Sequence, residues 1–163
     1  MPRSPHAAPA DPVRIGVIAD THGLLRPEAI RALHGCDRIV HAGDIGSPQV
    51  LQALRAIAPV DAIVGNVDRG EWAAELPAHL ELVIGGARIR LLHDLNHLPA
   101  HPRPWDVVIS GHSHQPRLEH RDGVLYLNPG SAGPRRFRLP VSLAYLHLHD
   151  GLVRGELHLL EVG

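Results

Sequence analysis

Apolar runs separated by short polar segments divide the first half of the chain into alternating strands and helices. The run from Val13 to Ala19 predicts a buried first strand, and Pro27 to His34 predicts a short helix opened by proline. Arg38 to Ala42 is a second strand, and Ser47 caps a helix that reaches about Ile57. Val60 to Val64 is a third strand. This β-α-β-α-β order indicates a parallel sheet with crossover helices.

The second half of the chain has paired strands and few helical signals. Glycine-containing turns separate strands that we expect to form three hairpins, and one further buried strand lies between the first and second hairpins. The expected strands are Leu80 to Ile84, Ala87 to His93, Asp106 to Ser110, Leu118 to His120, Val124 to Leu127, Ser142 to His149 and Leu152 to Leu160. We therefore predict an α/β fold, a sandwich of two mixed sheets flanked by helices, with the later strands mostly antiparallel.

Length and charge limit the classes of protein that fit. The 163 residues fit one domain, which we place at residues 13–163, after a disordered leader from Met1 to Pro12 that is rich in Pro and Ala. No run of 18 apolar residues exists, so we expect no membrane span. A net charge of −1 and a pI near 6.9 give no general footprint for nucleic acid. The default location is cytoplasmic.

The numbers of cysteines and histidines narrow the kinds of site that the chain can form. Cys36 is the only cysteine, which excludes an intramolecular disulfide and a thiolate zinc site, and we interpret it as a half-buried apolar residue. The chain has 14 histidines, and their spacing decides what they mean. His147, His149 and His158 alternate with leucines, so we expect them to face solvent on one side of their strands.

Polar side chains with metal-binding groups follow the ends of five predicted strands. In an open α/β sheet the carboxyl ends of parallel strands share one edge, so these side chains should lie close together. Carboxylate, imidazole and amide oxygen together suit Mn, Fe, Zn, Ni or Co, and two such ions about 3.5–4 Å apart could clamp a phosphate. The segments are Asp20-Thr21-His22, Gly43-Asp44, Gly65-Asn66, His93 and Gly111-His112-Ser113-His114.

This ordered set resembles the calcineurin-like metallophosphoesterases, whose pattern is D-x-H, G-D, G-N-x-D/E, H and G-H-x-H. The third block here continues to Asp68. The chain is most similar to the small YfcE-like phosphodiesterase subgroup, because it also carries two further motifs. These are His41-Ala42-Gly43-Asp44 and Asn128-Pro129-Gly130-Ser131, the second followed soon after by Pro134-Arg135. The resemblance runs from about Val13 to Leu160.

The resemblance implies a dinuclear hydrolase with two divalent ions per chain, manganese being favoured over Fe, Zn, Ni or Co. A hydroxide between the ions would attack a small phosphodiester or phosphomonoester. Asp44, Asn66, His93 and Asp68 would be catalytic. The implied ligands are Asp20, His22 and His114 for the first ion, Asn66, His93 and His112 for the second, and Asp44 for both.

Two positions depart from the family pattern. Many members have a histidine after the Asn of the third block, where it helps to protonate the leaving group, and here that position is Val67. The usual H-G-H is replaced by His93-Asp94-Leu95, which weakens the assignment of His93. His97 is either a substitute acid or a surface histidine.

Several polar residues near these blocks keep two interpretations. Asp68 either holds a neighbouring loop or is a turn residue, and His41 either touches the site or is a buried strand histidine. Asn128 either braces the rim or simply makes a turn. The arginines of the segment 135–138 bind phosphate or belong to a solvated loop.

Two other functions share this architecture. A retromer subunit of the same fold works through protein contacts, so a non-catalytic protein-binding scaffold is the alternative. A nuclease would need a DNA-binding cap or a basic surface, which the sequence lacks. We therefore expect a small phosphoester as partner, no membrane and no nucleic acid, and leave homo-oligomerisation open.

Overall fold

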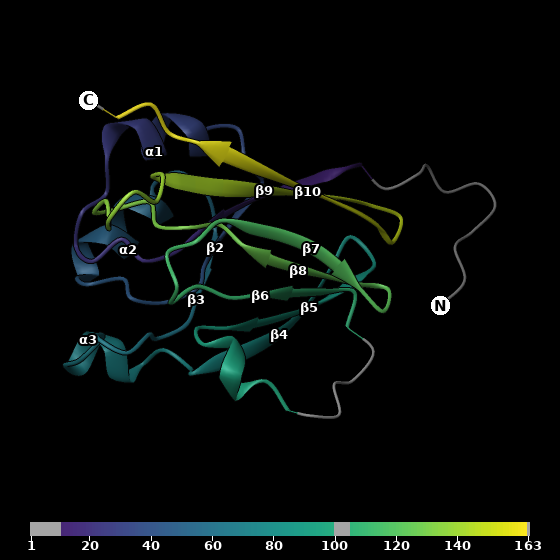
Figure 1. The fold of residues 1–163 in the computed structure, drawn as a ribbon, viewed down its shortest axis with the longest axis horizontal. Coiled ribbons are helices and arrows are strands. Elements are labelled where there is room, and N and C mark those ends of the chain that lie inside the picture. Colours follow the sequence, from purple (N-terminus) through teal and green to yellow (C-terminus); the bar gives the residue numbers. More distant parts are fainter. Residues whose placement is uncertain (1–10, 100–104, 163) are drawn as a thin grey trace.

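The computed structural model describes residues 11–99 and 105–162, so most of the expected leader lies outside the described residues. Two five-stranded sheets pack face to face, in the orders β10-β9-β1-β2-β3 and β4-β5-β6-β8-β7 (Figure 1). The predicted fold class is confirmed. The elements are β1 Val13–Ile18, α1 Pro27–Leu33, β2 Arg38–His41, α2 Pro48–Arg55, β3 Val60–Ala62, α3 Glu71–Ala74, β4 His79–Ile84, β5 Ala87–Leu92, the 3-10 helix η1 Leu95–His97, β6 Val107–Ile109, β7 Arg117–Arg121, β8 Val124–Asn128, β9 Ser142–His149 and β10 Leu152–Leu159.

The central strand of the first sheet, β1, is buried on both faces. In β1, Ile15 and Val17 face the second sheet, whereas Ile18 faces the layer of helices α1 and α2. Gly16 also faces that layer, where a Cβ would lie 2.3 Å from Leu33 Cδ2. Strands β1, β2 and β3 run parallel, and the crossover helices bring their carboxyl ends to one edge.

The second sheet differs from the prediction in the direction of its central strands. β4 pairs antiparallel with β5, and β7 with β8, as expected for hairpins. However, β5, β6 and β8 are parallel to one another, so the expectation of mostly antiparallel later strands is wrong for this sheet. Strand β6 is buried at all three positions and β8 at Leu125, Leu127 and Asn128. Short apolar runs of this kind carry no information about strand direction.

The helical predictions were mostly confirmed. Pro27 and Pro48 open α1 and α2, but α2 ends at Arg55, and the Ser47 side chain makes no capping hydrogen bond. Helices α3 and η1 were not predicted, because segments of four and three residues show no helical periodicity. Cys36 is more buried than expected, with 8% of its surface exposed, because it packs under α1 in the core.

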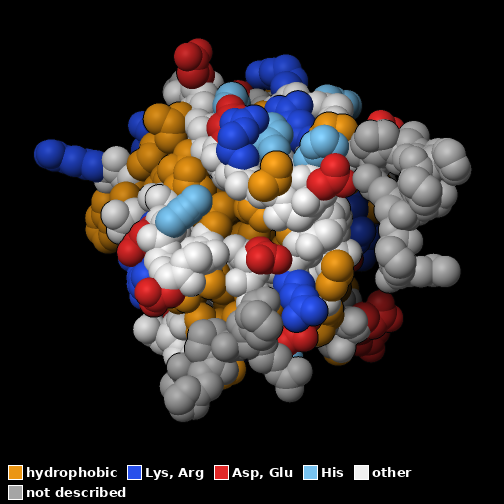
Figure 2. Space-filling view, turned by 90° about the vertical axis from the view of Figure 1, so that its right-hand side faces the viewer, with side chains coloured by type: hydrophobic (Ala, Val, Ile, Leu, Met, Phe, Trp, Pro, Cys, Tyr) orange, Lys and Arg blue, Asp and Glu red, His pale blue; other side chains and the backbone are white. Residues whose placement is uncertain are grey.

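The hairpin turns lie at the end of the molecule opposite the helices (Figure 1). There Gly151 donates a backbone hydrogen bond to the Gly85 carbonyl, which joins the β9–β10 turn to the β4–β5 turn. Figure 2 shows hydrophobic side chains interspersed with charged and histidine side chains at this end. The register of β9 and β10 puts His147, His149 and His158 on one face, as predicted. Within the described residues, no helix is both long and apolar enough to cross a bilayer.

Candidate metal centre

Four loops at the carboxyl ends of β1, β2, β5 and β6 are joined by backbone hydrogen bonds. The Asp20 and His22 N–H groups donate to the carbonyls of Gly43 and Asp44, both at 3.0 Å. The Gly111 N–H donates to the His93 carbonyl at 3.0 Å. These bonds join neighbouring loops within each sheet and fix the backbone from which the predicted ligands project.

The backbone of the predicted ligands is strained. Asp20, His22, Asp44, His112 and His114 have φ between 47° and 72°, and only three other non-glycine residues in the described part of the chain have positive φ. Two of those three, Asp122 and Asp150, lie in hairpin turns. L-residues rarely adopt this conformation, and such strain clusters at functional sites.

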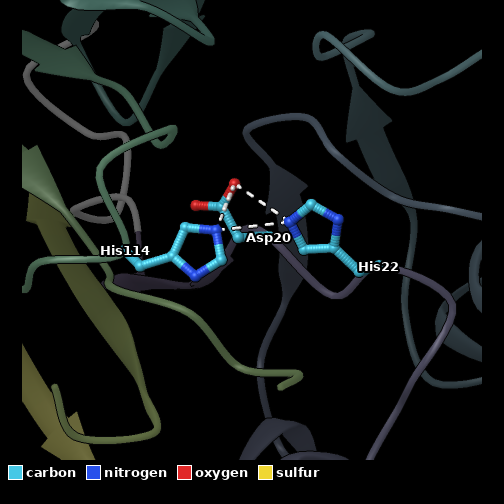
Figure 3. Close-up of side chains that lie close together, drawn as sticks. All are labelled: Asp20, His22 and His114. Carbon is cyan, nitrogen blue, oxygen red and sulfur yellow. Dashed lines mark hydrogen bonds and ion pairs between the residues drawn. The ribbon is translucent and has the colours of Figure 1, made fainter. Parts of the chain in front are cut away.

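Asp20, His22 and His114 form a compact cluster, which we call the first ligand group (Figure 3). The two Nε2 atoms of the imidazoles are 3.3 Å apart. Asp20 Oδ1 lies 4.0 Å from His22 Nε2 and 3.7 Å from His114 Nε2. This oxygen is buried and accepts no hydrogen bond, although Asp20 Oδ2 accepts one from the His112 N–H. Three ligand atoms thus face one small volume.

Asp44 stands between this group and His93. Its Oδ2 lies 3.7 Å from His22 Nε2 and 3.2 Å from His93 Nε2, and its Oδ1 accepts a hydrogen bond from the Val67 N–H. The orientation of Asp44 is therefore fixed by the backbone, and one oxygen is left between imidazoles from two different loops. This is the position that a bridging ligand needs.

The other three predicted ligands, Asn66, His93 and His112, form the second ligand group, which is more open. His93 is buried, its Nδ1–H donates to the Ala42 carbonyl at 2.8 Å, and its Nε2 makes no hydrogen bond to any residue that the structure describes. Its ring centroid is 5.2 Å from that of His112, whose side chain is 43% exposed. Asn66 is exposed and lines a hollow with His93.

Burial and neighbouring groups shift the pKa values of three predicted ligands. Burial raises the pKa of Asp20 to about 7, against the opposing effect of His93. Burial also opposes ionisation of Asp44, but the His93 side chain and the Val67 N–H outweigh it and hold the Asp44 pKa at about 2. Burial, and then Arg136, lower the pKa of His114 to about 4, which keeps that imidazole neutral and able to bind a cation.

Asp68 holds the loops that carry Asp44 and Asn66. Its carboxylate accepts hydrogen bonds from the N–H groups of Ile45, Gly46 and Gly65, at 2.9 to 3.1 Å. These bonds favour the bracing interpretation over a plain turn residue. Gly65 is needed at this point, because a Cβ there would lie 2.2 Å from Asp44 Oδ1.

His41 belongs to a fully buried hydrogen-bond chain. Its Nδ1 accepts from the Gly43 N–H, so its Nε2 carries the proton and donates to Thr21 Oγ1 at 3.0 Å. The Thr21 hydroxyl donates in turn to the Ile45 carbonyl. Burial lowers the pKa of His41 to about 3. The neutral ring therefore connects the loop of Asp20 with the loop of Asp44, a role that Thr21 shares and the sequence did not reveal.

The Asn-Pro-Gly-Ser segment braces the opposite rim. Asn128 Nδ2 donates to the Gly111 carbonyl at 2.9 Å, and its Oδ1 accepts from the Gly130 N–H. Ser131 Oγ lies 2.9 Å from the Asp20 carbonyl and 3.0 Å from the Pro134 carbonyl. Asn128 therefore supports the loop of His112 and His114, in line with the rim interpretation.

In the arginine-rich segment 135–138, the charge of Arg136 lowers the pKa values of Asp20 and His114. Gly133 packs against Thr21, since a Cβ would lie 2.2 Å from the Thr21 carbonyl oxygen, and it accepts a hydrogen bond from Arg26. This contact places the arginine segment beside the first ligand group. It favours phosphate binding for one of the three arginines.

Known proteins share both the sequence and the fold. A probable metallophosphoesterase from Methanothermobacter thermautotrophicus is 38% identical over 135 residues, which cover 72% of this chain and 76% of the relative. An archaeal phosphodiesterase has a TM-score of 0.70 at 23% identity, covering 89% of this chain and 99% of that one. Vacuolar protein sorting 29 from Cryptosporidium parvum has a TM-score of 0.73 at 19% identity, covering 93% and 99%.

The family model for the calcineurin-like phosphoesterase superfamily domain matches residues 13–151. This span includes every strand that carries a predicted ligand. Together with the sequence identity to the archaeal relative, the match confirms the resemblance seen in the motifs. The chain belongs to the calcineurin-like phosphoesterase superfamily.

Proposed function

We propose that this protein hydrolyses small phosphodiesters with two divalent cations, bound by the first and second ligand groups and shared through Asp44. The observation that carries the proposal is the buried oxygen Asp20 Oδ1. It accepts no hydrogen bond among the described residues, and it faces the Nε2 atoms of His22, His93 and His114 at 3.7 to 4.0 Å.

The residues present fit metal ions. A buried carboxylate oxygen that accepts no hydrogen bond is disfavoured unless a cation compensates its charge. Ligands at about 2.0–2.2 Å from a tetrahedral ion lie about 3.3–3.6 Å from one another, and His22 Nε2 and His114 Nε2 are 3.3 Å apart. The donor set has oxygen and imidazole nitrogen but no thiolate, which suits Mn²⁺, our favoured metal, as well as Fe, Zn, Ni and Co.

When bound, the ions would supply a nucleophile at neutral pH and would stabilise the charge on the phosphoryl oxygens. The protein's own residues set the geometry. Asp68 and Val67 hold the backbone and side chain of Asp44, and His41 holds its loop against that of Asp20. Arg136 adds positive charge on the side of the first ligand group, where an anionic substrate would approach.

Two hollows beside the second ligand group support a diester rather than a monoester. One, of about 240 Å³, is lined by residues that include His112, Arg117 and Asn128. The other, of about 250 Å³, is lined by residues that include Asn66 and His93. A phosphodiester carries two organic substituents, and each hollow can take one of them.

The second hollow also bears on protonation of the leaving group. Val67 cannot donate a proton, but His79 and His97 line the hollow together with Asn66. Imidazole is the side-chain group that most often acts as a general acid or base. A leaving group that enters this hollow would therefore lie near two histidines that could protonate it.

The test is hydrolysis of bis(4-nitrophenyl) phosphate by metal-stripped protein to which Mn²⁺, Ni²⁺, Zn²⁺ or Mg²⁺ is added back. We expect turnover that returns with at least one metal and that exceeds turnover of 4-nitrophenyl phosphate. Absence of turnover with every metal, together with absence of bound metal by elemental analysis, would refute the proposal.

A protein-binding scaffold is the competing function, and the fold likeness to vacuolar protein sorting 29 supports it. The completeness of the ligand set argues for the enzyme. All seven expected positions carry metal-binding side chains, and five of them keep a strained backbone that a scaffold would have no need to maintain.

A further inference from the structure

We propose that Asp94 is a positioning residue that selects the nitrogen with which His112 binds the second ion. In this proposal the His112 Nε2–H donates to the Asp94 carboxylate, and His112 Nδ1 faces the ion. The inference rests on the proposed function, because it assumes that the second ligand group holds a metal.

The two oxygens of Asp94 have separate tasks. Oδ1 accepts a hydrogen bond at 3.0 Å from the Asn96 N–H and so caps η1. Oδ2 lies 3.9 Å from His112 Nε2. This distance exceeds a hydrogen bond, and in our proposal the contact tightens when the ion binds, as contacts in active sites often do.

The backbone of His112 directs the ring. Its N–H donates to Asp20 Oδ2 at 3.1 Å, and its φ of 72° is held by this bond at the end of the β6 loop. The main chain of His112 is therefore attached to the metal centre itself. Since Nδ1 is the ring nitrogen nearer the main chain and Nε2 points to Asp94, Nδ1 is the nitrogen left for the ion.

His93 shows the opposite arrangement. Its Nδ1–H donates to the Ala42 carbonyl, so its Nε2 is the ligand atom and faces Asp44 Oδ2. The second ion would therefore take Nε2 from one histidine and Nδ1 from the other. A carboxylate that accepts from the far nitrogen of a ligating histidine fixes its tautomer and orientation and makes the ring a stronger donor.

Glycine, the residue expected at this position from the family pattern, can do none of this. It has no oxygen to cap η1 and no charge to place against His112. Asp94 also lies where the two hollows meet, because it lines both of them. The substitution thus adds a negative charge at the centre of the proposed substrate site, next to the more exposed histidine of the second ligand group.

The sharpest variant is Asp94→Asn. Asparagine keeps an oxygen for the Asn96 N–H, but it turns an N–H₂ donor toward the His112 N–H, so the two groups no longer attract. We expect the weaker of two Mn²⁺ dissociation constants, measured by isothermal titration calorimetry, to rise about 10–100-fold, the usual effect of losing such a partner. The tighter constant should change little. Asp122→Asn is the matched control, since Asp122 lies in the β7–β8 turn with φ of 52° and asparagine tolerates that conformation.

A second measurement uses the unaltered protein and does not depend on how a variant folds. Long-range ¹H–¹⁵N spectra of ¹⁵N-histidine-labelled, Zn²⁺-loaded protein distinguish a metal-bound ring nitrogen from one that carries hydrogen. We expect His112, assigned by the loss of its signals in His112→Gln, to be bound through Nδ1 with a protonated Nε2. His93 should show the reverse pattern.

Binding of His112 through Nε2, or an unchanged weaker constant in Asp94→Asn, would overturn the role of Asp94 and leave the proposed function intact. Failure of the unaltered protein to bind any divalent ion would overturn both. The two ideas are thus separated without any assay of hydrolysis.

Discussion

The two ligand groups differ in burial and in freedom of movement. Asp20 and His114 are almost entirely buried, and the two imidazole nitrogens of the first group already lie at the spacing of ligands on one ion. In the second group only His93 is buried, while Asn66 is exposed and the His112 side chain is 43% exposed. A preorganised site binds more tightly than one that must be ordered by its ligand. We therefore expect the first ion to be held firmly and the second to be weaker and to face the substrate.

The largest effect should come from removing the residue that the two groups share. Asp44→Asn keeps the size of the side chain but removes the charge between His22 and His93. We expect kcat/KM to fall by at least about 10³-fold, because both ions lose a ligand and their positions relative to each other. Elemental analysis should show less of both metals, whereas Asp122→Asn should keep both. Near-normal rates in Asp44→Asn would contradict the bridging role.

Variants in each group separately test the comparison itself. His114→Gln should remove the tight ion, and excess metal should not restore activity, because an amide replaces the imidazole ligand in a buried site that solvent cannot complete. His112→Gln should spare the tight ion and lower activity about 10²-fold at low metal concentration, with partial recovery as Mn²⁺ is raised. Equal behaviour of the two variants in metal titrations would show that the groups do not differ as we describe.

The residues proposed for this site were found in the sequence because their signals are local, and the fold brings them close together. Each ligand directly follows an apolar run, and the parallel order of β1, β2 and β3 brings Asp20, Asp44 and Asn66 to one edge. The ordered motifs also identified the family. The direction of β5, β6 and β8 could not be predicted, because strand pairing depends on contacts distant in sequence.

The supporting residues were harder to find than the ligands. Asp68, Asn128 and His41 were noticed but kept two interpretations, since a side chain that holds a loop has no sequence signature of its own. Thr21 and Ser131 were missed, although both lie inside motifs that were recognised. Their roles depend on backbone carbonyls at Ile45 and Asp20, which are close only in the folded chain.

A histidine at position 67 would test whether the second ligand group lacks a group that protonates the leaving group. Val67 is 49% exposed, and its N–H already contacts Asp44. Val67→His should raise the rate for diesters with poor alkoxide leaving groups about 10–10²-fold, with little change for 4-nitrophenolate, which needs no acid. Comparison of kcat for the two leaving-group classes is the measurement. Equal changes for both classes would indicate an effect other than proton donation. Val67→Gln, which has no group that titrates near neutral pH, is the control.

The hydrogen-bond chain behind the first group predicts a pH dependence of stability. The pKa of His41 is about 3 in the folded protein and 6.5 ordinarily, so between these values only the unfolded chain takes up the proton. The contribution of His41 to the stability of the metal-free protein should therefore fall as pH falls through this window, by up to about 1.4 kcal/mol per pH unit. Urea unfolding of the unaltered protein and of His41→Gln should show a shallower decline in the variant. Identical slopes would exclude His41 as the cause.

The smallest effect is expected at the rim. Arg136→Gln should raise KM for the diester about 3–10-fold and leave kcat nearly unchanged, because the arginine attracts the anionic substrate rather than contacting the reacting atoms. Raising the ionic strength should reduce the difference between the two proteins. Arg55→Gln, on α2, is the control for loss of one positive charge elsewhere.

The central claim is that two ions of unequal affinity share Asp44, and calorimetric titration of the metal-stripped protein with Mn²⁺ tests it most directly. The account predicts two ions per chain with separable dissociation constants, the tighter lost in His114→Gln, the weaker alone affected in His112→Gln, and both weakened in Asp44→Asn. A single ion per chain, or two ions that the Asp44→Asn change leaves untouched, would contradict it.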